Sequence, residues 1–132
     1  MNLAIVGSRS FIDFELFENK IDNFIIQNDI NKKDLIIISG GAKGVDTLAR
    51  RYAIKNKIAL VEYLPDWNLH GKSAGMIRNL EIVKNCDKLI AFWCNNSKGT
   101  EHSITEAKKL NKDVIILKFD DPKINEIPKL KI

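Results

Sequence analysis

The chain has 132 residues, of which 45% are hydrophobic, and this is enough apolar material for one globular domain with its own core. Its 21 basic and 17 acidic side chains give a net charge of +4, which suits an anionic ligand without requiring a nucleic acid. The two cysteines and two histidines lack the spacing of a zinc site, so we expect no metal. No apolar run is long enough to span a membrane, and the first one is too short for a signal peptide. We therefore expect a cytoplasmic protein without membrane contact.

Short apolar runs recur along the chain and predict five strands, over residues 3–6, 35–38, 59–64, 88–93 and 114–117. The stretches between them have helical periodicity, as at Phe14, Phe17 and Ile21. Because the strands are almost wholly apolar, we expect both of their faces to be buried. Alternating strands and helices predict an α/β fold of the Rossmann-like, doubly wound kind, with a mostly parallel five-stranded sheet in a three-layer sandwich. We expect a single domain over residues 1–132, with a core over 1–118 and a short tail over 119–132.

Ligands of such folds bind beyond the carboxyl ends of the strands, so the loops that follow the first four strands are the candidate sites. Gly7, Ser8 and Arg9 follow the first strand. Gly7 permits a tight turn, Ser8 and Ser10 can donate hydrogen bonds, and Arg9 can hold an oxyanion with two donors. The alternative is an ordinary turn that leads into a capped helix.

The second strand is followed by a glycine-rich turn and the start of a helix. Glycines allow positive φ, and the unpaired N–H groups of a helix start can bind phosphate. A serine and a lysine add a hydroxyl and a positive charge, and an aspartate in the first helical turn can accept a hydrogen bond from a ribose or base. The candidate ligand-binding residues here are Ser39, Gly40, Gly41, Ala42, Lys43, Gly44 and Asp46. Two alternatives remain: the glycines serve only to turn the chain, and Asp46 only complements the helix dipole.

A long polar loop over residues 65–75 follows the third strand, and loops of this length often line a site. Trp67 within it can stack on a base, although packing is the commoner use of an aromatic residue. Arg78 lies beside the apolar stripe of the next helix, next to Asn79, where its charge needs a partner or a ligand.

The fourth strand leads into Lys98, Gly99 and Thr100, which again place a glycine before a helix start, with Glu101 in the first turn. Thr100 as an ordinary helix cap is the alternative. We expect these two helix starts, on neighbouring strands, to converge with Arg9 and Arg78 into one nucleotide phosphate site.

Four stretches together resemble the SLOG superfamily, which contains the Lonely-Guy phosphoribohydrolases and the DNA-processing protein A (Smf) group. The resemblance spans residues 3 to about 118 and is greatest to the small YspA-like, YpsA-related branch. It implies a Rossmann-like sheet and a nucleotide or nucleotide-derived ligand at these loops, and we expect no cofactor. Superfamily members often assemble as dimers, so it also implies a homodimer or a higher homo-oligomer. The matching stretches are residues 5–9, 38–46, 75–79 and 98–100.

Lonely-Guy enzymes cleave the N-glycosidic bond of nucleoside monophosphates with a Pro-Gly-Gly-x-Gly-Thr-x-x-Glu motif and an upstream Arg-Lys pair. Gly99-Thr100 and Arg78 match these patterns, whereas Ser103 stands where the family has the glutamate and Asn79 where it has the lysine. If the chain is an enzyme, the resemblance implies a catalytic role for Arg78. Glu101 or Glu106 would supply the carboxylate, although neither stands at the position of the family's glutamate. Such cleavage requires a carboxylate near the sugar.

The missing glutamate favours a binding protein, a sensor or a sequestering protein, over a phosphoribohydrolase in which Glu101 or Asp46 would assist at the ribose. Single-stranded DNA binding has weaker support, because no basic groove interleaved with aromatic residues is present, and we do not expect a nucleic-acid partner. A dinucleotide dehydrogenase is disfavoured as well, since only Gly7 follows the first strand where a Gly-x-Gly-x-x-Gly pattern belongs.

Overall fold

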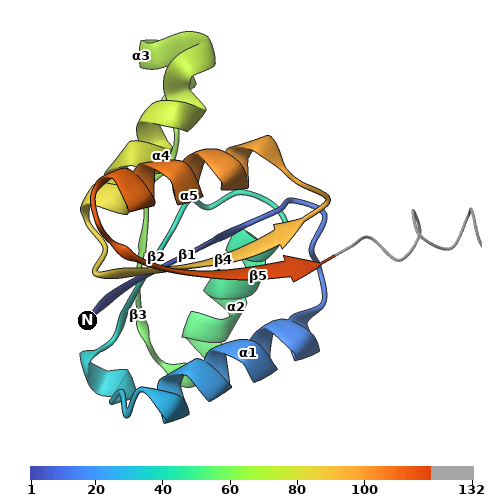
Figure 1. Cartoon of the computed structure of the whole chain (residues 1–132), viewed down its shortest axis with the longest axis vertical. Coiled ribbons are helices and arrows are strands. Elements are labelled where there is room, and N and C mark those ends of the chain that lie inside the picture. The colour runs from blue at the N-terminus through green and yellow to red at the C-terminus, as the bar shows by residue number, and fades with distance from the viewer. Residues whose placement is uncertain (120–132) are drawn as a thin grey trace, which may run out of the picture.

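The computed structural model describes residues 1–119, which form a five-stranded parallel sheet with helices on both faces (Figure 1). Each pair of neighbouring strands is parallel, in the order β3-β2-β1-β4-β5. This arrangement confirms the predicted Rossmann-like α/β fold. The strands are β1 (Asn2–Gly7), β2 (Ile36–Ser39), β3 (Ala59–Glu62), β4 (Lys88–Cys94) and β5 (Asp113–Phe119).

Helices α1 (Phe14–Gln27) and α2 (Val45–Asn56) cover one face of the sheet, and α4 (Ala74–Lys84) and α5 (Lys98–Lys109) cover the other (Figure 1). A 3-10 turn, η1 (Lys32–Asp34), precedes β2. Alternate residues of β1 point into opposite cores, with Leu3 packed among residues of α1 and α2 and Ala4 among residues of α4 and α5. Burial on both faces explains why the central strands are apolar throughout. The edge strands β3 and β5 are partly exposed, in contrast to the expectation of full burial.

The segment after β3 differs from the predicted irregular loop over residues 65–75. It contains a short helix, α3 (Trp67–His70), and a 3-10 turn, η2 (Gly71–Ser73), that leads directly into α4. The Asp66 side chain caps α3 by accepting a hydrogen bond from Leu69 N at 3.0 Å, so a capping residue in the predicted loop begins a helix instead. In Figure 1, α3 projects away from the sheet.

The strand order determines where a ligand site can form. β1 lies in the middle of the sheet, with β2 on one side and β4 on the other, so the expectation that the two glycine-containing helix starts follow neighbouring strands is wrong. The chain moves outward from β1 to β3 and then crosses to the other side of β1. The ends of β1 and β4 therefore form the switch point, where open α/β sheets bind their ligands.

The tail expected over residues 119–132 lies outside the described residues except for Phe119, which ends β5. The single-domain organisation of residues 1–132 stays a prediction. Within residues 1–119, none of the helices has the length and apolar character needed to cross a membrane.

Candidate functional site

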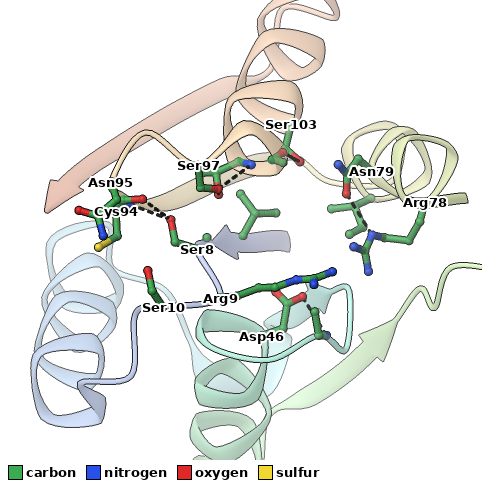
Figure 2. Close-up of a pocket in the computed structure, with 16 residues that line it drawn as sticks. Ser8, Arg9, Ser10, Asp46, Arg78, Asn79, Cys94, Asn95, Ser97 and Ser103 are labelled. Carbon is green, nitrogen blue, oxygen red and sulfur yellow. Dashed lines mark hydrogen bonds between the residues drawn. The ribbon is translucent and has the colours of Figure 1, made fainter. Parts of the chain in front are cut away.

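A cavity of about 450 Å³ opens at the carboxyl ends of β1 and β4, between the starts of α2 and α5 and beside α4 (Figure 2). Its volume lies within the range of about 300–1,000 Å³ that is usual for small-molecule sites. The cavity is lined by Val6, Gly7, Ser8, Arg9, Ser10, Ala42, Asp46, Arg78, Asn79, Ile82, Cys94, Asn95, Ser97, Gly99, Thr100 and Ser103.

The structure brings together part of the predicted site. The predicted residues that line the cavity are Gly7, Ser8, Arg9, Ala42, Asp46, Arg78, Asn79, Gly99 and Thr100. The predicted residues outside this lining are Ser39, Gly40, Gly41, Lys43, Gly44, Trp67, Lys98 and Glu101.

Ser8 joins the ends of β1 and β4. Its buried hydroxyl donates to Cys94 O at 2.9 Å and accepts from Cys94 N at 2.8 Å (Figure 2). The carbonyl of Ser8 accepts from Val45 N at 3.3 Å and so occupies the first amide of α2. The hydroxyl predicted as a ligand donor is therefore engaged within the protein, while the exposed Arg9 extends along the cavity wall above Asp46 (Figure 2).

The glycine-rich turn after β2 is hydrogen-bonded to a side chain from the first turn of α2. Ala42 N donates to Asp46 Oδ2 at 3.0 Å, so a carboxylate of the protein occupies this amide. Gly41 and Gly44 have φ values of 70° and 72°, and a Cβ at Gly44 would overlap the carbonyl groups of Ser8 and Arg9. The backbone conformation of the turn thus explains the glycines at these two positions without a ligand.

Asp46, which is buried, and Arg78, which is half-buried, lie close enough at the cavity wall for their opposite charges to interact. Burial raises the pKa of Asp46, and the Ala42 amide, the Arg78 charge and the nearby Ser39 hydroxyl oppose the rise. Ser39 Oγ makes no hydrogen bond of regular geometry among the described residues. Arg78 Nη1 donates to Gly40 O at 2.6 Å. Burial lowers the pKa of Arg78, Asp46 opposes this, and the repulsion of Arg9 adds to it, so two guanidinium groups lie within electrostatic range of each other.

Both polar atoms of the Asn79 side chain are engaged, although Asn79 was predicted as a ligand contact. Its Oδ1 accepts from Arg78 Nε at 3.0 Å, and its Nδ2 is hydrogen-bonded to His102 Nδ1 at 3.2 Å. These bonds connect α4 with α5 and fix the Arg78 side chain from a second direction.

The start of α5, like the start of α2, has two first-turn amides without a partner within residues 1–119, and those of α2 are Asp46 N and Thr47 N. The Ser97 hydroxyl caps the helix, accepting from Thr100 N at 3.3 Å and sharing a 2.9 Å hydrogen bond with the Thr100 hydroxyl. The amides of Lys98 and Gly99 have no partner within residues 1–119. Such first-turn N–H groups carry the positive end of the helix dipole and attract anions.

Gly99 has no conformational explanation within the described chain. Its φ is not positive, and a Cβ there would meet no atom within 4 Å. Glycine in a helix is less favourable than alanine by roughly 0.5–1 kcal/mol. The glycine therefore leaves the backbone of this turn bare at the cavity.

Several lining residues were missed by sequence reasoning, and one of them had a usable signal. Ser103 lies one helical turn after Gly99, is buried, and donates to Gly99 O at 3.4 Å. It stands where the Lonely-Guy motif has its glutamate, so its place in that motif was a signal that it lines the site. Contacts between distant segments place the others, which are Val6, Ile82, Cys94, Asn95 and Ser97.

Comparisons with known proteins agree with this fold. Residues 1–70 match YAcAr, the YspA, cpYpsA-related SLOG family. The Gene 61 protein of Mycobacterium phage D29 is 38% identical over 87 residues, which cover 61% of this chain and 70% of that protein.

Among solved structures, DNA processing protein A from Streptococcus pneumoniae matches with a TM-score of 0.66 and 21% identity, over 87% of this chain and 49% of that one. The DNA processing protein A of Helicobacter pylori, described for its single-stranded DNA binding mode, matches with a TM-score of 0.65 and 20% identity. The match covers 88% of this chain and 64% of that one. A structural genomics target, TM1055, matches with a TM-score of 0.61 and 16% identity, over 86% of this chain and 71% of that one. This chain thus spans about half to two thirds of the two DNA processing proteins, and the likeness concerns the fold alone.

Proposed function

Because the chain belongs to the YspA, cpYpsA-related SLOG family, we propose that its cavity binds a nucleotide or nucleotide-derived molecule, with the phosphate at the start of α5. The protein would act as a sensor of this ligand or sequester it. The observation that carries the proposal is Gly99, a glycine that the described fold does not require, whose amide and that of Lys98 have no partner among residues 1–119.

A phosphate at this position meets several donors at once. The amides of Lys98 and Gly99 point out of the helix start, where the dipole favours negative charge. The hydroxyls of Ser97 and Thr100 border the same opening. The exposed Arg9, which lies along the Asp46 wall, would turn toward α5 to offer a phosphate oxygen two donors. This combination favours a phosphate over a neutral ligand.

The opposite wall suits the sugar. Asp46 is the one carboxylate among the described residues that line the cavity, and it faces the wall that carries Ser97 and Ser103 (Figure 2). Carboxylate oxygens accept hydrogen bonds from hydroxyl groups, as a ribose offers. The glycine-rich turn after β2 then has a supporting role: its Ala42 amide holds Asp46, and Gly40 O holds Arg78.

Calorimetry with nucleoside monophosphates and the matching nucleosides tests the proposal. At least one monophosphate should bind about tenfold or more tightly than its nucleoside, because the phosphate adds charge-assisted hydrogen bonds. Equal affinities for both members of every pair would contradict a phosphate site.

A phosphoribohydrolase is the second candidate, and the position of Asp46 supports it. Glu101 does not line the cavity, whereas Asp46 does, and its raised pKa eases proton transfer at a leaving group. Chromatography after incubation with nucleoside monophosphates separates the two functions. Free base that is released by the wild type and not by Asp46→Asn would establish cleavage, whereas binding without release would support a sensor or sequestering protein.

A further inference from the structure

We propose that His102 is a positioning residue for this site: in its neutral form it holds Asn79, and through Asn79 the Arg78 guanidinium, so that protonating His102 weakens anion binding. His102 lies on α5 and does not line the cavity. The effect on a ligand rests on the proposed function, whereas the hydrogen-bond chain exists without it.

The chain of contacts runs from α5 across to α4. His102 Nδ1 and Asn79 Nδ2 are 3.2 Å apart, and Arg78 Nε donates to Asn79 Oδ1 at 3.0 Å. Figure 2 shows the second of these bonds, with the Arg78 guanidinium directed into the space below Asn79. Beyond it, Arg78 Nη1 donates to Gly40 O at 2.6 Å.

The donors and acceptors fix the direction of every bond in this chain. A guanidinium only donates, so Asn79 must present its oxygen to Arg78 and its NH₂ group to His102. An amide NH₂ also only donates, so His102 Nδ1 must carry a lone pair. A neutral imidazole with a lone pair at Nδ1 holds its proton at Nε2, which faces Glu106 Oε1 at 3.8 Å.

Protonation of His102 breaks this order. It places an N–H at Nδ1 opposite the NH₂ group of Asn79, so that two donors face each other. If Asn79 rotates to present its oxygen to His102, the NH₂ group then opposes Arg78 Nε. In the first case Asn79 loses the bond to His102 that orients it, and in the second Arg78 loses its hydrogen bond to Asn79 at the cavity wall.

Charged groups of both signs flank this chain of hydrogen bonds, from α5 and from α4. Glu106 lies beside His102 Nε2 on α5, and Lys109 in turn contacts Glu106 at 3.3 Å. From α4, Arg78 stands behind Asn79, with Asp46 beyond it. Histidine is the side chain that ordinarily changes its charge between pH 5 and 8.

The first test needs no ligand. The protein has two histidines, so His70 serves as an internal reference in ¹⁵N-detected imidazole spectra of the full chain. In its neutral form His102 should carry its proton on Nε2, and the Arg78 Nε–H resonance should move when acidification protonates the His102 ring. A proton on Nδ1, or an Arg78 resonance indifferent to that titration, overturns the inference.

The second test measures binding of sulfate, whose charge stays constant over this range, by titration of the Lys98 and Gly99 amide resonances. His102→Asn keeps a neutral acceptor near the Nδ1 position and cannot be protonated, and His70→Asn is the matched control. The wild type and the control should lose roughly tenfold more affinity on acidification than His102→Asn does.

The two proposals fail in different ways. An identical pH dependence of sulfate binding in the wild type and His102→Asn overturns the inference about His102 and leaves the anion site standing. If sulfate binds none of the three proteins at any pH, the anion site of the proposed function is contradicted, and the control by His102 with it.

Discussion

Gly44 and Gly99 both stand at the start of a helix, yet the structure requires a glycine only at the first. Gly44 has a positive φ and lies against the carbonyl groups of Ser8 and Arg9, so a side chain there is excluded. Gly99 has an ordinary helical conformation with open space where a Cβ would stand. The difference assigns a folding role to the first glycine and, in our proposal, a ligand contact to the second.

Substituting Gly99→Ala tests this difference, with Gly75→Ala in α4 as the matched control. A Cβ at Gly75 would make ordinary contact with Trp67 at 3.8 Å, away from the cavity. We expect both changes to leave the free energy of unfolding equal or raise it by up to about 1 kcal/mol, measured in urea.

We expect Gly99→Ala alone to weaken nucleoside monophosphate binding by roughly tenfold or more in calorimetry, because its methyl group would block the amides. Equal affinities of the two variants would remove the argument from Gly99.

Asp46 gives a prediction about pH. Burial raises its pKa above the ordinary value of 3.8, so folding favours the protonated carboxyl. The stability that this contributes is present below the ordinary pKa and is lost as the pH rises through the raised folded-state value. Relative to Asp46→Asn, which does not titrate, the wild type should lose stability across that range in urea unfolding. A relative gain of the wild type with rising pH would show the sign to be wrong.

At the scale of elements, the link between the ends of β1 and β4 holds the site open at the switch point. The Ser8 hydroxyl satisfies both the N–H and the carbonyl of Cys94. Because Cys94 is buried, removing the hydroxyl takes the hydrogen bond of Ser8 from its N–H and leaves its carbonyl with the bond from Ser97 N at 3.3 Å. The geometry of the cavity therefore depends on a serine that we do not expect to contact the ligand.

We expect Ser8→Ala to lower the free energy of unfolding by about 1–3 kcal/mol, whereas Ser10→Ala should change it by less than about 0.5 kcal/mol. Ser10 lines the same cavity, but its side chain is exposed. Urea denaturation of both variants measures the difference, and a loss of the same size in both would mean that the Ser8 bridge contributes little.

The elements that sequence predicted well are those in which burial dictates composition. A strand such as residues 35–38 must be apolar throughout to be buried on both faces, and that pattern is visible locally. Helical turns in residues 65–75 were missed, because the cap at Asp66 is also compatible with a loop. Strand order was missed for a different reason: pairing of β1 with β4 joins segments far apart in the chain, and local patterns do not encode it.

The same distinction applies to the candidate site. The loops that border the cavity were predicted from the rule for open α/β sheets, and Gly99 and Arg78 follow from it. The hydrogen bond from the Ala42 amide to Asp46 was not predicted, since an aspartate in the first helical turn is equally explained by the helix dipole. The bond between Asn79 and His102 depends on how α4 packs against α5, which neither sequence segment reveals alone.

At the scale of the whole molecule, a net charge of +4 gives only a weak electrostatic attraction for nucleic acids. The likeness to DNA processing proteins concerns the fold, so the absence of a nucleic-acid partner stays a prediction. Fluorescence anisotropy with single-stranded oligonucleotides should give no strongly salt-dependent binding. Tight binding that weakens about a hundredfold or more between 50 and 200 mM salt would instead favour a DNA-binding role.

The most direct measurement is an amide ¹H–¹⁵N NMR titration of the full chain with adenosine 5′-monophosphate and, separately, with adenosine. Our account predicts that the monophosphate shifts the amide resonances of Lys98 and Gly99 strongly, that adenosine shifts them little, and that Ala42 keeps its bond to Asp46 in both cases. Large phosphate-dependent shifts at Gly41, Ala42 and Gly44, with Lys98 and Gly99 unmoved, would contradict it.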